Sequence, residues 1–136
     1  MLLFVYGTLR KGFQHPAFTY ISENFEYVSE ATVKGRLFDL GEYPAAIPAE
    51  SGYAIRGELY RLKADAEWNW AIAQLDDYEG LFPEEGETPL YNRSEAPVEL
   101  PEGTTDKAWV YWYNGDTAGY PEILSGDFLQ YHRLRG

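Results

Sequence analysis

Apolar residues occur in short runs separated by glycine, and this pattern predicts strands in the first third of the chain. Residues 2–6 form an apolar run that stops at Gly7, as expected of a buried strand. Residues 25–40 have an extended character, and we expect breaks at Gly35 and Gly41 because glycine often interrupts a strand.

Three later segments carry different patterns. Residues 41–48 are bounded by Gly and Pro and are predicted to form a loop. Residues 53–62 alternate, with Glu58 and Tyr60 opposite the apolar positions, so we predict a strand with one exposed face. Residues 107–113 place aromatic or apolar side chains on both faces, which favours a sheet that is covered on both sides or closed on itself.

Residues 64–79 carry the strongest helical pattern, and residues 15–24 are predicted to form a second, short helix. Asp65 suits the N-terminal end of the longer helix, and Gly80 stands where a left-handed residue often ends one. The irregular stretch that follows, residues 81–88, is predicted to be a loop.

The acidic residues at the end of this helix point in different directions. The apolar stripe of the helix is formed by Trp68, Ile72 and Leu75. Four residues beyond Leu75, the same face carries Glu79, whereas Asp77 points to the opposite side and Asp76 lies at the flank of the stripe. Glu79 therefore continues the buried stripe, and Asp77 is expected to be solvated.

A carboxylate at this position has the properties of a base. On the core-facing side of a helix end, desolvation and the partial negative charge of the last helical carbonyls are both expected to raise the pKa of Glu79. The same residues also fit a helix that frays before Tyr78, so that Glu79 lies at the surface or pairs with an arginine. Periodicity alone leaves both interpretations open.

Taken together, the elements predict an α+β fold built on a small curled sheet or barrel. No repeat, linker or low-complexity block divides the 136 residues, and we expect a single domain over 1–136. With 45% hydrophobic and 17% aromatic residues, the chain is able to form a substantial core.

Composition excludes several classes of function. The net charge of -11 disfavours nucleic acid and anionic membrane surfaces as partners. With 0 Cys there is no disulfide or thiol nucleophile, and the two histidines, His15 and His132, have no metal-ligand spacing. We therefore expect no bound metal. The apolar start is too short for a signal peptide or a membrane span, so we also expect a soluble cytoplasmic protein.

The turn after the first strand, YGTLRKG over residues 6–12, is a candidate anion site. Gly7 allows main-chain N–H groups to be presented, with Arg10 and Lys11 nearby, and such groups hold carboxylates. It lacks the spacing of a nucleotide-binding loop, and a tight surface turn with solvated basic side chains fits the same residues.

Seven segments in order along the chain together resemble the gamma-glutamylcyclotransferase-like family, most closely its gamma-glutamylamine cyclotransferases and small bacterial members. The segments are FVYGTLRKG (4–12), LFDLGEYPAAIP (37–48), IRGELYRL (55–62), LDDYEG (75–80), YNR (91–93), AWVYWY (108–113) and ILSGDF (123–128). The resemblance covers nearly the whole chain and implies a small mixed β-barrel with flanking helices.

The resemblance also implies a reaction and the residues that perform it. Characterised members release 5-oxoproline from a gamma-glutamyl amide, without a metal or cofactor, so the implied partner is a small-molecule gamma-glutamyl substrate. The acid of the LDDYEG motif acts as general acid and base, and here it is Glu79. The implied substrate-binding residues are Tyr6, Gly7, Thr8 and Leu9 of the first turn, with Tyr43 and Tyr113 as further pocket residues.

Two alternatives to the cyclotransferase function, from other functional classes, also fit the sequence. One is a non-catalytic pocket that binds a small gamma-glutamyl or amino-acid-like ligand, since some small bacterial relatives lack the acid. The other is an interaction domain, which the presence of Glu79 disfavours. The sequence leaves open the leaving group of the substrate, a pairing partner for Arg93 and the oligomeric state.

Overall fold

A computed structural model describes residues 2–7, 19–40, 44–49, 52–64, 66–78 and 91–135 of the chain. The strands are β1 (Leu2–Val5), β2 (Phe25–Asp39), β3 (Pro44–Pro48), β4 (Ala54–Leu62), β5 (Tyr91–Glu99) and β6 (Thr105–Tyr113). The helices are α1 (Thr19–Ser22), α2 (Trp68–Tyr78) and α3 (Phe128–Arg135). In the described part of the chain, no helix is long and apolar enough to cross a membrane.

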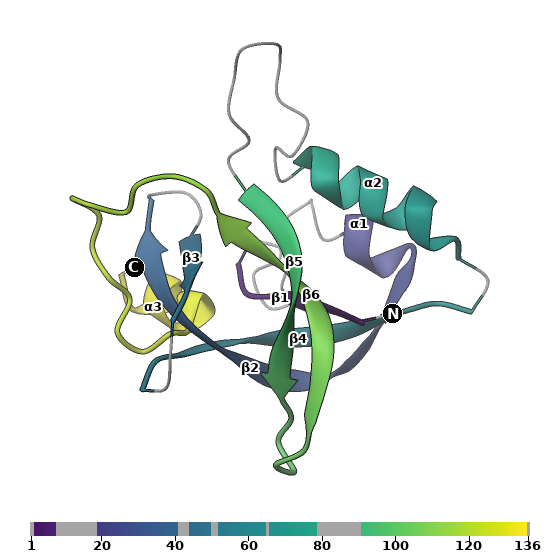
Figure 1. The fold of residues 1–136 in the computed structure, drawn as a ribbon, viewed down its shortest axis with the longest axis horizontal. Helices are drawn as coiled ribbons and strands as arrows, with labels where there is room; N and C mark the ends of the chain where they lie inside the picture. The colour runs from purple at the N-terminus through teal and green to yellow at the C-terminus, as the bar shows by residue number, and fades with distance from the viewer. Residues whose placement is uncertain are drawn as a thin grey trace.

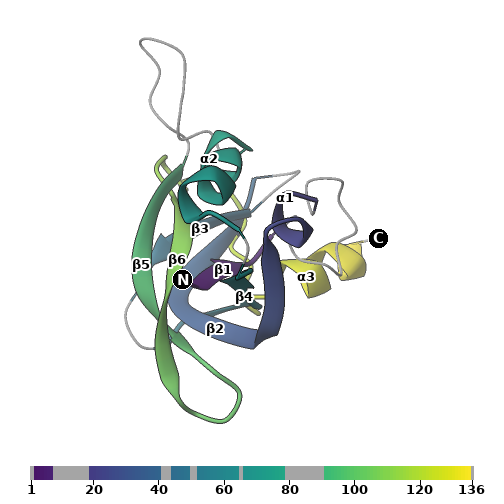
Figure 2. The same cartoon turned by 90° about the vertical axis from the view of Figure 1, so that its right-hand side faces the viewer.

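Five strands close into a barrel in the order β2, β4, β1, β6 and β5, because β5 pairs back onto β2 (Figure 2). The barrel is mixed, since β1 and β6 run parallel while the other neighbouring strands are antiparallel. β3 adds to the second half of β2. The predicted α+β fold, a small mixed barrel with flanking helices, is confirmed.

Two hydrophobic clusters hold the fold together. One is formed by alternate residues of the barrel strands, such as Phe4, Leu59 and Val110, and fills the interior. The other joins the outer face of β1, β4 and β6 to Ile21 of α1 and Leu75 of α2. Aromatic residues at both faces of β6 were predicted from the sequence, and β6 indeed contributes buried side chains to both clusters.

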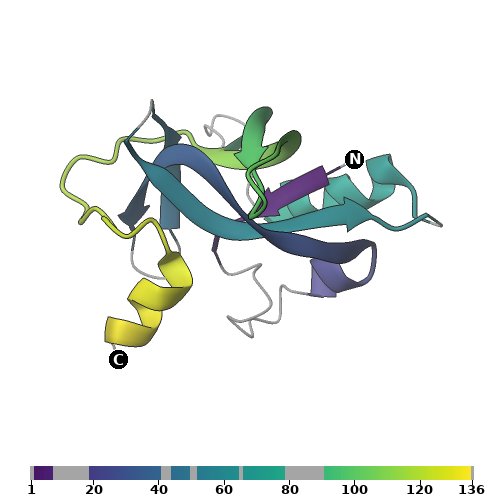
Figure 3. The ribbon, with the colours of Figure 1, turned by 90° about the horizontal axis from the view of Figure 1, so that it is seen from below.

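The helices lie on different sides of the barrel. α1 and α2 pack together on one side, and α3 lies on the other (Figures 1 and 3). α3 was not predicted from the sequence, although Asp127 is suited to begin it. The carboxylate of Asp127 accepts a hydrogen bond from the backbone N–H of Gln130 at 3.1 Å, as an N-terminal capping residue does.

The predicted break at Gly35 is wrong, because β2 continues through it. A Cβ at residue 35 would lie 2.6 Å from Cδ1 of Ile55 and 2.9 Å from the carbonyl oxygen of Ile47. Glycine is needed here because β2, β3 and β4 approach closely, and not because the chain turns.

The predicted loop over 41–48 is also partly wrong, since Pro44–Pro48 forms β3. The two prolines stand at the first and last positions of a strand that pairs with β2 alone. Proline is tolerated at such edge positions because a missing N–H removes no bond from the interior of the sheet.

The prediction of one exposed face on β4 is wrong at Glu58 and Tyr60, whose exposed fractions are 4% and 2%. Closure of the barrel buries one face, and packing against the helices buries part of the other. Alternation in a sequence identifies the two faces of a strand, but not what covers the more polar face.

The helix predicted over 64–79 begins later, at Trp68. Before it, the N–H of Ala66 donates a hydrogen bond to the carbonyl of Lys63 at 3.0 Å, and the predicted N-terminal residue Asp65 lies outside the described residues. The apolar stripe is confirmed, with Ile72 and Leu75 buried. The short helix predicted over 15–24 contains α1, and the loop predicted over 81–88 lies outside the described residues.

Candidate active site at one end of the barrel

The end of β1 brings Tyr6 and Gly7 against two other segments. The Tyr6 side chain is buried, and its hydroxyl donates a hydrogen bond to the main-chain carbonyl of Tyr111 in β6. Gly7 lies against the first residue of β3, because a Cβ at residue 7 would be 3.0 Å from Cδ and Cγ of Pro44. Glycine therefore permits the close approach of the first turn to β3.

Tyr113 lies at the same end of the barrel. It faces Tyr91 in the register of β5 and β6, and the two rings pack edge to face with centroids 5.6 Å apart. The Tyr91 hydroxyl donates to the carbonyl oxygen of Pro44 at 2.7 Å. The ends of β1 and β6 thus meet the beginnings of β3 and β5, so residues far apart in sequence are neighbours here.

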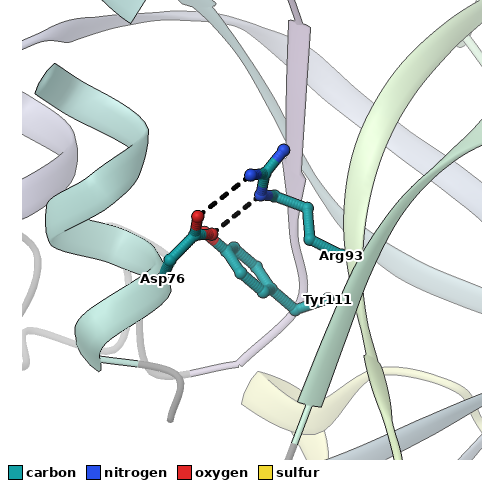
Figure 4. A network of polar contacts seen from close by, with 3 residues as sticks. All are labelled: Asp76, Arg93 and Tyr111. Carbon is teal, nitrogen blue, oxygen red and sulfur yellow. Dashed lines mark hydrogen bonds and ion pairs between the residues drawn. The ribbon is translucent and has the colours of Figure 1, made fainter. Parts of the chain in front are cut away.

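The C-terminal part of α2 is fixed to β5 and β6 by Asp76 (Figure 4). Arg93 of β5 donates from Nε to Oδ1 of Asp76 at 2.7 Å and from Nη2 to Oδ2 at 2.9 Å. The hydroxyl of Tyr111 in β6 donates to Oδ1 at 2.8 Å. Asp76, a residue that is buried as a whole, therefore receives three hydrogen bonds from two strands.

Arg93 is held on two sides. The hydrogen bond to Asp76, with the attraction between the two charges, raises the pKa of Arg93 above its ordinary value, so the guanidinium stays charged. Its Cζ also lies 4.9 Å from the ring centroid of Trp109, within the range of a cation–π contact. Because both oxygens of Asp76 are bonded to side chains of the neighbouring strands, Asp76 is suited to holding α2 against the sheet.

Glu58 is a second buried carboxylate near this end of the barrel. It accepts a hydrogen bond from the Tyr60 hydroxyl at 2.8 Å. In the pairing of β4 with β1 it stands opposite Val5, the residue before Tyr6. A buried carboxyl group therefore stands beside the end of β1.

The structure brings three of the predicted site residues together, namely Tyr6, Gly7 and Tyr113. The other four, Thr8, Leu9, Tyr43 and Glu79, lie outside the described residues, as does Gly80. Residues close to them in sequence do make contacts at this end of the barrel. Gly7 lies against Pro44, and Asp76 binds side chains of β5 and β6.

Sequence reasoning missed the burial of Asp76 and its pairing with Arg93. The signal was present, because Trp68, Ile72 and Asp76 follow one another at the helical spacing of four residues. We placed Asp76 at the flank of the stripe, whereas it is buried. An unpaired carboxylate at a buried position requires a cationic partner, and the YNR segment supplies one.

Two other features were considered as sites in the described part of the chain, a metal centre and a cavity. No cluster of three or more His, Cys, Asp or Glu in the described part of the chain could hold a metal ion. A cavity of about 420 Å³ lies toward the end of β5 away from Tyr91 and is lined in part by Thr32, Arg56 and Glu99. It contains none of the predicted site residues.

Comparison with known proteins identifies relatives over nearly the whole chain. Residues 3–130 match the family described as gamma-glutamyl cyclotransferase, AIG2-like. The Escherichia coli K12 protein named gamma-glutamylcyclotransferase family protein YtfP is 32% identical over 132 residues, covering 95% of this chain and 96% of that protein. The Niallia circulans protein named gamma-L-glutamyl-butirosin B gamma-glutamyl cyclotransferase is 31% identical over 137 residues, covering 95% and 76%.

A solved structure supports the same relationship at the level of the fold. The crystal structure of YkqA from Bacillus subtilis superposes with a TM-score of 0.72 at 26% sequence identity. The match covers 98% of this chain but 41% of YkqA, so this chain spans less than half of that protein.

Proposed function

The chain belongs to the AIG2-like gamma-glutamyl cyclotransferase family, and we propose that it releases 5-oxoproline from gamma-glutamyl amides. The names of the family and of its relatives support a gamma-glutamyl cyclotransferase activity in general. The observation that carries the proposal is the match over residues 3–130, which includes every segment that converges at this end of the barrel.

The proposed reaction is an intramolecular aminolysis. The α-amine of the glutamyl group attacks its own γ-carbonyl carbon, a C–N bond forms in a five-membered lactam, and the amide C–N bond to the leaving group breaks. One proton leaves the α-amine and one is delivered to the departing nitrogen, so 5-oxoproline and a free amine or amino acid are produced without water. No metal or cofactor takes part.

We assign Glu79 as the group that moves these protons. A carboxylate with a raised pKa removes a proton from the α-amine and returns one to the leaving nitrogen. The partner set of Asp76 supports this choice among the acids of LDDYEG, because Arg93 and Tyr111 already occupy the oxygens of Asp76. Glu79 follows Asp76 by three residues and comes directly after Tyr78, the last residue of α2.

We assign binding of the glutamyl group to the first turn. Main-chain N–H groups around Gly7 suit both a substrate carboxylate and the oxyanion that develops on the γ-carbonyl. Thr8 and Leu9 follow Gly7 in the sequence and are assigned to the same binding segment, and Tyr6 before it is bonded to the Tyr111 carbonyl of β6. Tyr43 and Tyr113 are proposed to line the part of the pocket that receives the leaving group.

The test is product analysis on a panel of gamma-glutamyl amines and gamma-glutamyl amino acids, using mass spectrometry to separate 5-oxoproline from glutamate. Cyclotransfer yields 5-oxoproline, whereas hydrolysis of the same amide yields glutamate. A substrate with an acetylated α-amine serves as the chemical control, because it is unable to attack its own carbonyl and is expected to give no product.

We predict that Glu79→Gln abolishes release of 5-oxoproline and leaves folding intact, since the amide has nearly the same shape but accepts no proton. Glu67→Gln, the same change at an exposed residue just before α2, is the matched control and is expected to keep wild-type turnover. Normal turnover by Glu79→Gln would exclude Glu79 as the base. Ligand binding without release by the wild type would favour the non-catalytic pocket.

A further inference from the structure

We infer that Asp76, Arg93 and Tyr111 are positioning residues, which set the C-terminal end of α2 relative to the end of β1. The inference rests on the proposed function, because α2 leads directly to Glu79 and β1 leads to the proposed glutamyl-binding turn. The cluster is largely shielded from solvent, with side-chain exposures of 5% for Asp76 and 20% for Arg93.

The first support is the geometry around Asp76. Two parallel bonds from Arg93 fix the plane of the carboxylate, and the bond from Tyr111 fixes it from a second strand (Figure 4). A bidentate pair is stronger and more directional than a single hydrogen bond. The last turns of α2 are therefore held against β5 and β6 in one orientation.

The second support is that Tyr111 touches both parts of the proposed site. Its side-chain hydroxyl bonds Asp76 of α2, and its main-chain carbonyl accepts the bond from Tyr6. One residue of β6 thus links the helix that precedes the proposed base to the residue that begins the proposed binding turn. Tyr111 is therefore in direct contact with both segments.

The third support is the way in which Arg93 is restrained. The Trp109 ring lies 4.9 Å from its Cζ, so the guanidinium is packed on a flat surface while it binds Asp76. Lysine has neither the planar fork nor the same stacking, and would bind Asp76 as a single mobile charge. The cluster therefore has the features of a rigid support, beyond the balance of two charges.

Such a support matters for a ring closure. The α-amine must be held in a near-attack geometry with the base beside it, and a misplacement of about 1 Å can cost about a hundredfold in rate. Binding of the glutamyl group to the first turn does not require the helix end to be in place. Loosening the cluster should therefore lower kcat while KM stays nearly constant.

The kinetic test is Tyr111→Phe, which removes one hydroxyl and keeps the main-chain carbonyl that Tyr6 uses. We expect kcat for 5-oxoproline release to fall between about tenfold and about a hundredfold, with KM within about twofold. Tyr131→Phe is the matched control, because it removes a hydroxyl that donates at 2.9 Å to another buried carboxylate, Asp39. The control is expected to change kcat and KM by less than about twofold. A wild-type kcat in Tyr111→Phe would overturn the inference.

A second measurement decides the inference without turnover. Hydrogen exchange of the amides of residues 75–78 is expected to be faster in Tyr111→Phe than in Tyr131→Phe, with both compared at equal global stability. Unchanged exchange at 75–78 would overturn the inference, whether or not the chain is an enzyme. Absence of 5-oxoproline release by the wild type would instead overturn the proposed function, so the two failures are distinguishable.

Discussion

Asp76 illustrates how much a single buried charge depends on its neighbours. A carboxylate removed from water costs several kcal/mol unless it is paired and hydrogen-bonded. Here Arg93 and Tyr111 supply three bonds, so a buried carboxylate is tolerated beside the second hydrophobic cluster, to which Tyr111 belongs. Because Arg93 and Tyr111 both bind Asp76, we assign Asp76 a structural role in the site.

Gly57 is a second residue whose identity is imposed by close packing. A Cβ at residue 57 would lie 2.3 Å from the carbonyl oxygen of Val5 and 2.6 Å from Cζ of Phe4. We predict that Gly57→Ala lowers the free energy of unfolding by about 1–3 kcal/mol, because the backbone of β1 must shift. Urea denaturation measures this change.

The exposed Ser94 of β5 offers a control for Gly57→Ala. Ser94→Ala is expected to change the free energy of unfolding by no more than about 0.5 kcal/mol, since it touches no such contact. Equal stability of wild type and Gly57→Ala would contradict the predicted clash between β4 and β1.

At the scale of elements, the long strand β2 is tied to the segment before α3. Arg36 donates from Nε to Glu122 at 3.0 Å and from Nη2 at 2.5 Å, and the two main chains form an isolated bridge between Phe38 and Glu122. The hydrogen bond from Arg36 lowers the pKa of Glu122 below its ordinary value of 4.5. The contribution of the Arg36–Glu122 pair to stability therefore depends on pH.

The direction of this pH dependence follows from the lowered pKa of Glu122. The pair contributes its full stability above the unfolded pKa of 4.5, and the contribution is lost as the pH falls through the lower folded pKa. We predict that Glu122→Gln is less stable than wild type near neutral pH and that the difference shrinks below 4.5. Urea denaturation across this range measures it.

Arg36→Gln is a second test of the same contact, because it removes the partner that lowers the pKa of Glu122. Like Glu122→Gln, it is expected to make the free energy of unfolding depend less on pH in this range. If the two variants changed with pH in opposite directions, the pairing of Arg36 with Glu122 would not be the cause.

At the scale of the whole molecule, the net charge of -11 acts on any charged substrate. A negative field attracts cations at long range and is screened by salt. We predict that gamma-glutamyl amides with a cationic leaving group have a higher kcat/KM than those with an anionic leaving group of similar size. Steady-state kinetics at several salt concentrations measure this difference.

Raising the ionic strength from about 0.01 M to about 0.5 M should reduce the preference, because the screening length falls with salt. A preference that does not depend on salt would point to direct contacts in the pocket instead of the overall field. No preference at low salt would contradict the prediction.

Agreement between the predicted and the observed elements varies along the chain. The strand over 2–6, the strand over 107–113 and the stripe on α2 were predicted correctly, because each rests on a local period and a buried face. Gly35 and the segment Pro44–Pro48 were misinterpreted, because glycine and proline mark either a turn or a particular place in a sheet. Only the neighbouring strands distinguish the two.

The sequence by itself determined the family, the fold class and the segments that carry the candidate chemistry, because motif order and hydrophobic period are written along the chain. The tertiary structure decided which of these segments meet. Closure of β5 onto β2 and docking of α2 bring Asp76, Arg93 and Tyr111 into one cluster, and Tyr6 is bonded to the main chain of Tyr111. The physical reason is that desolvation and pairing of a charge depend on groups distant in sequence, which only folding brings into contact.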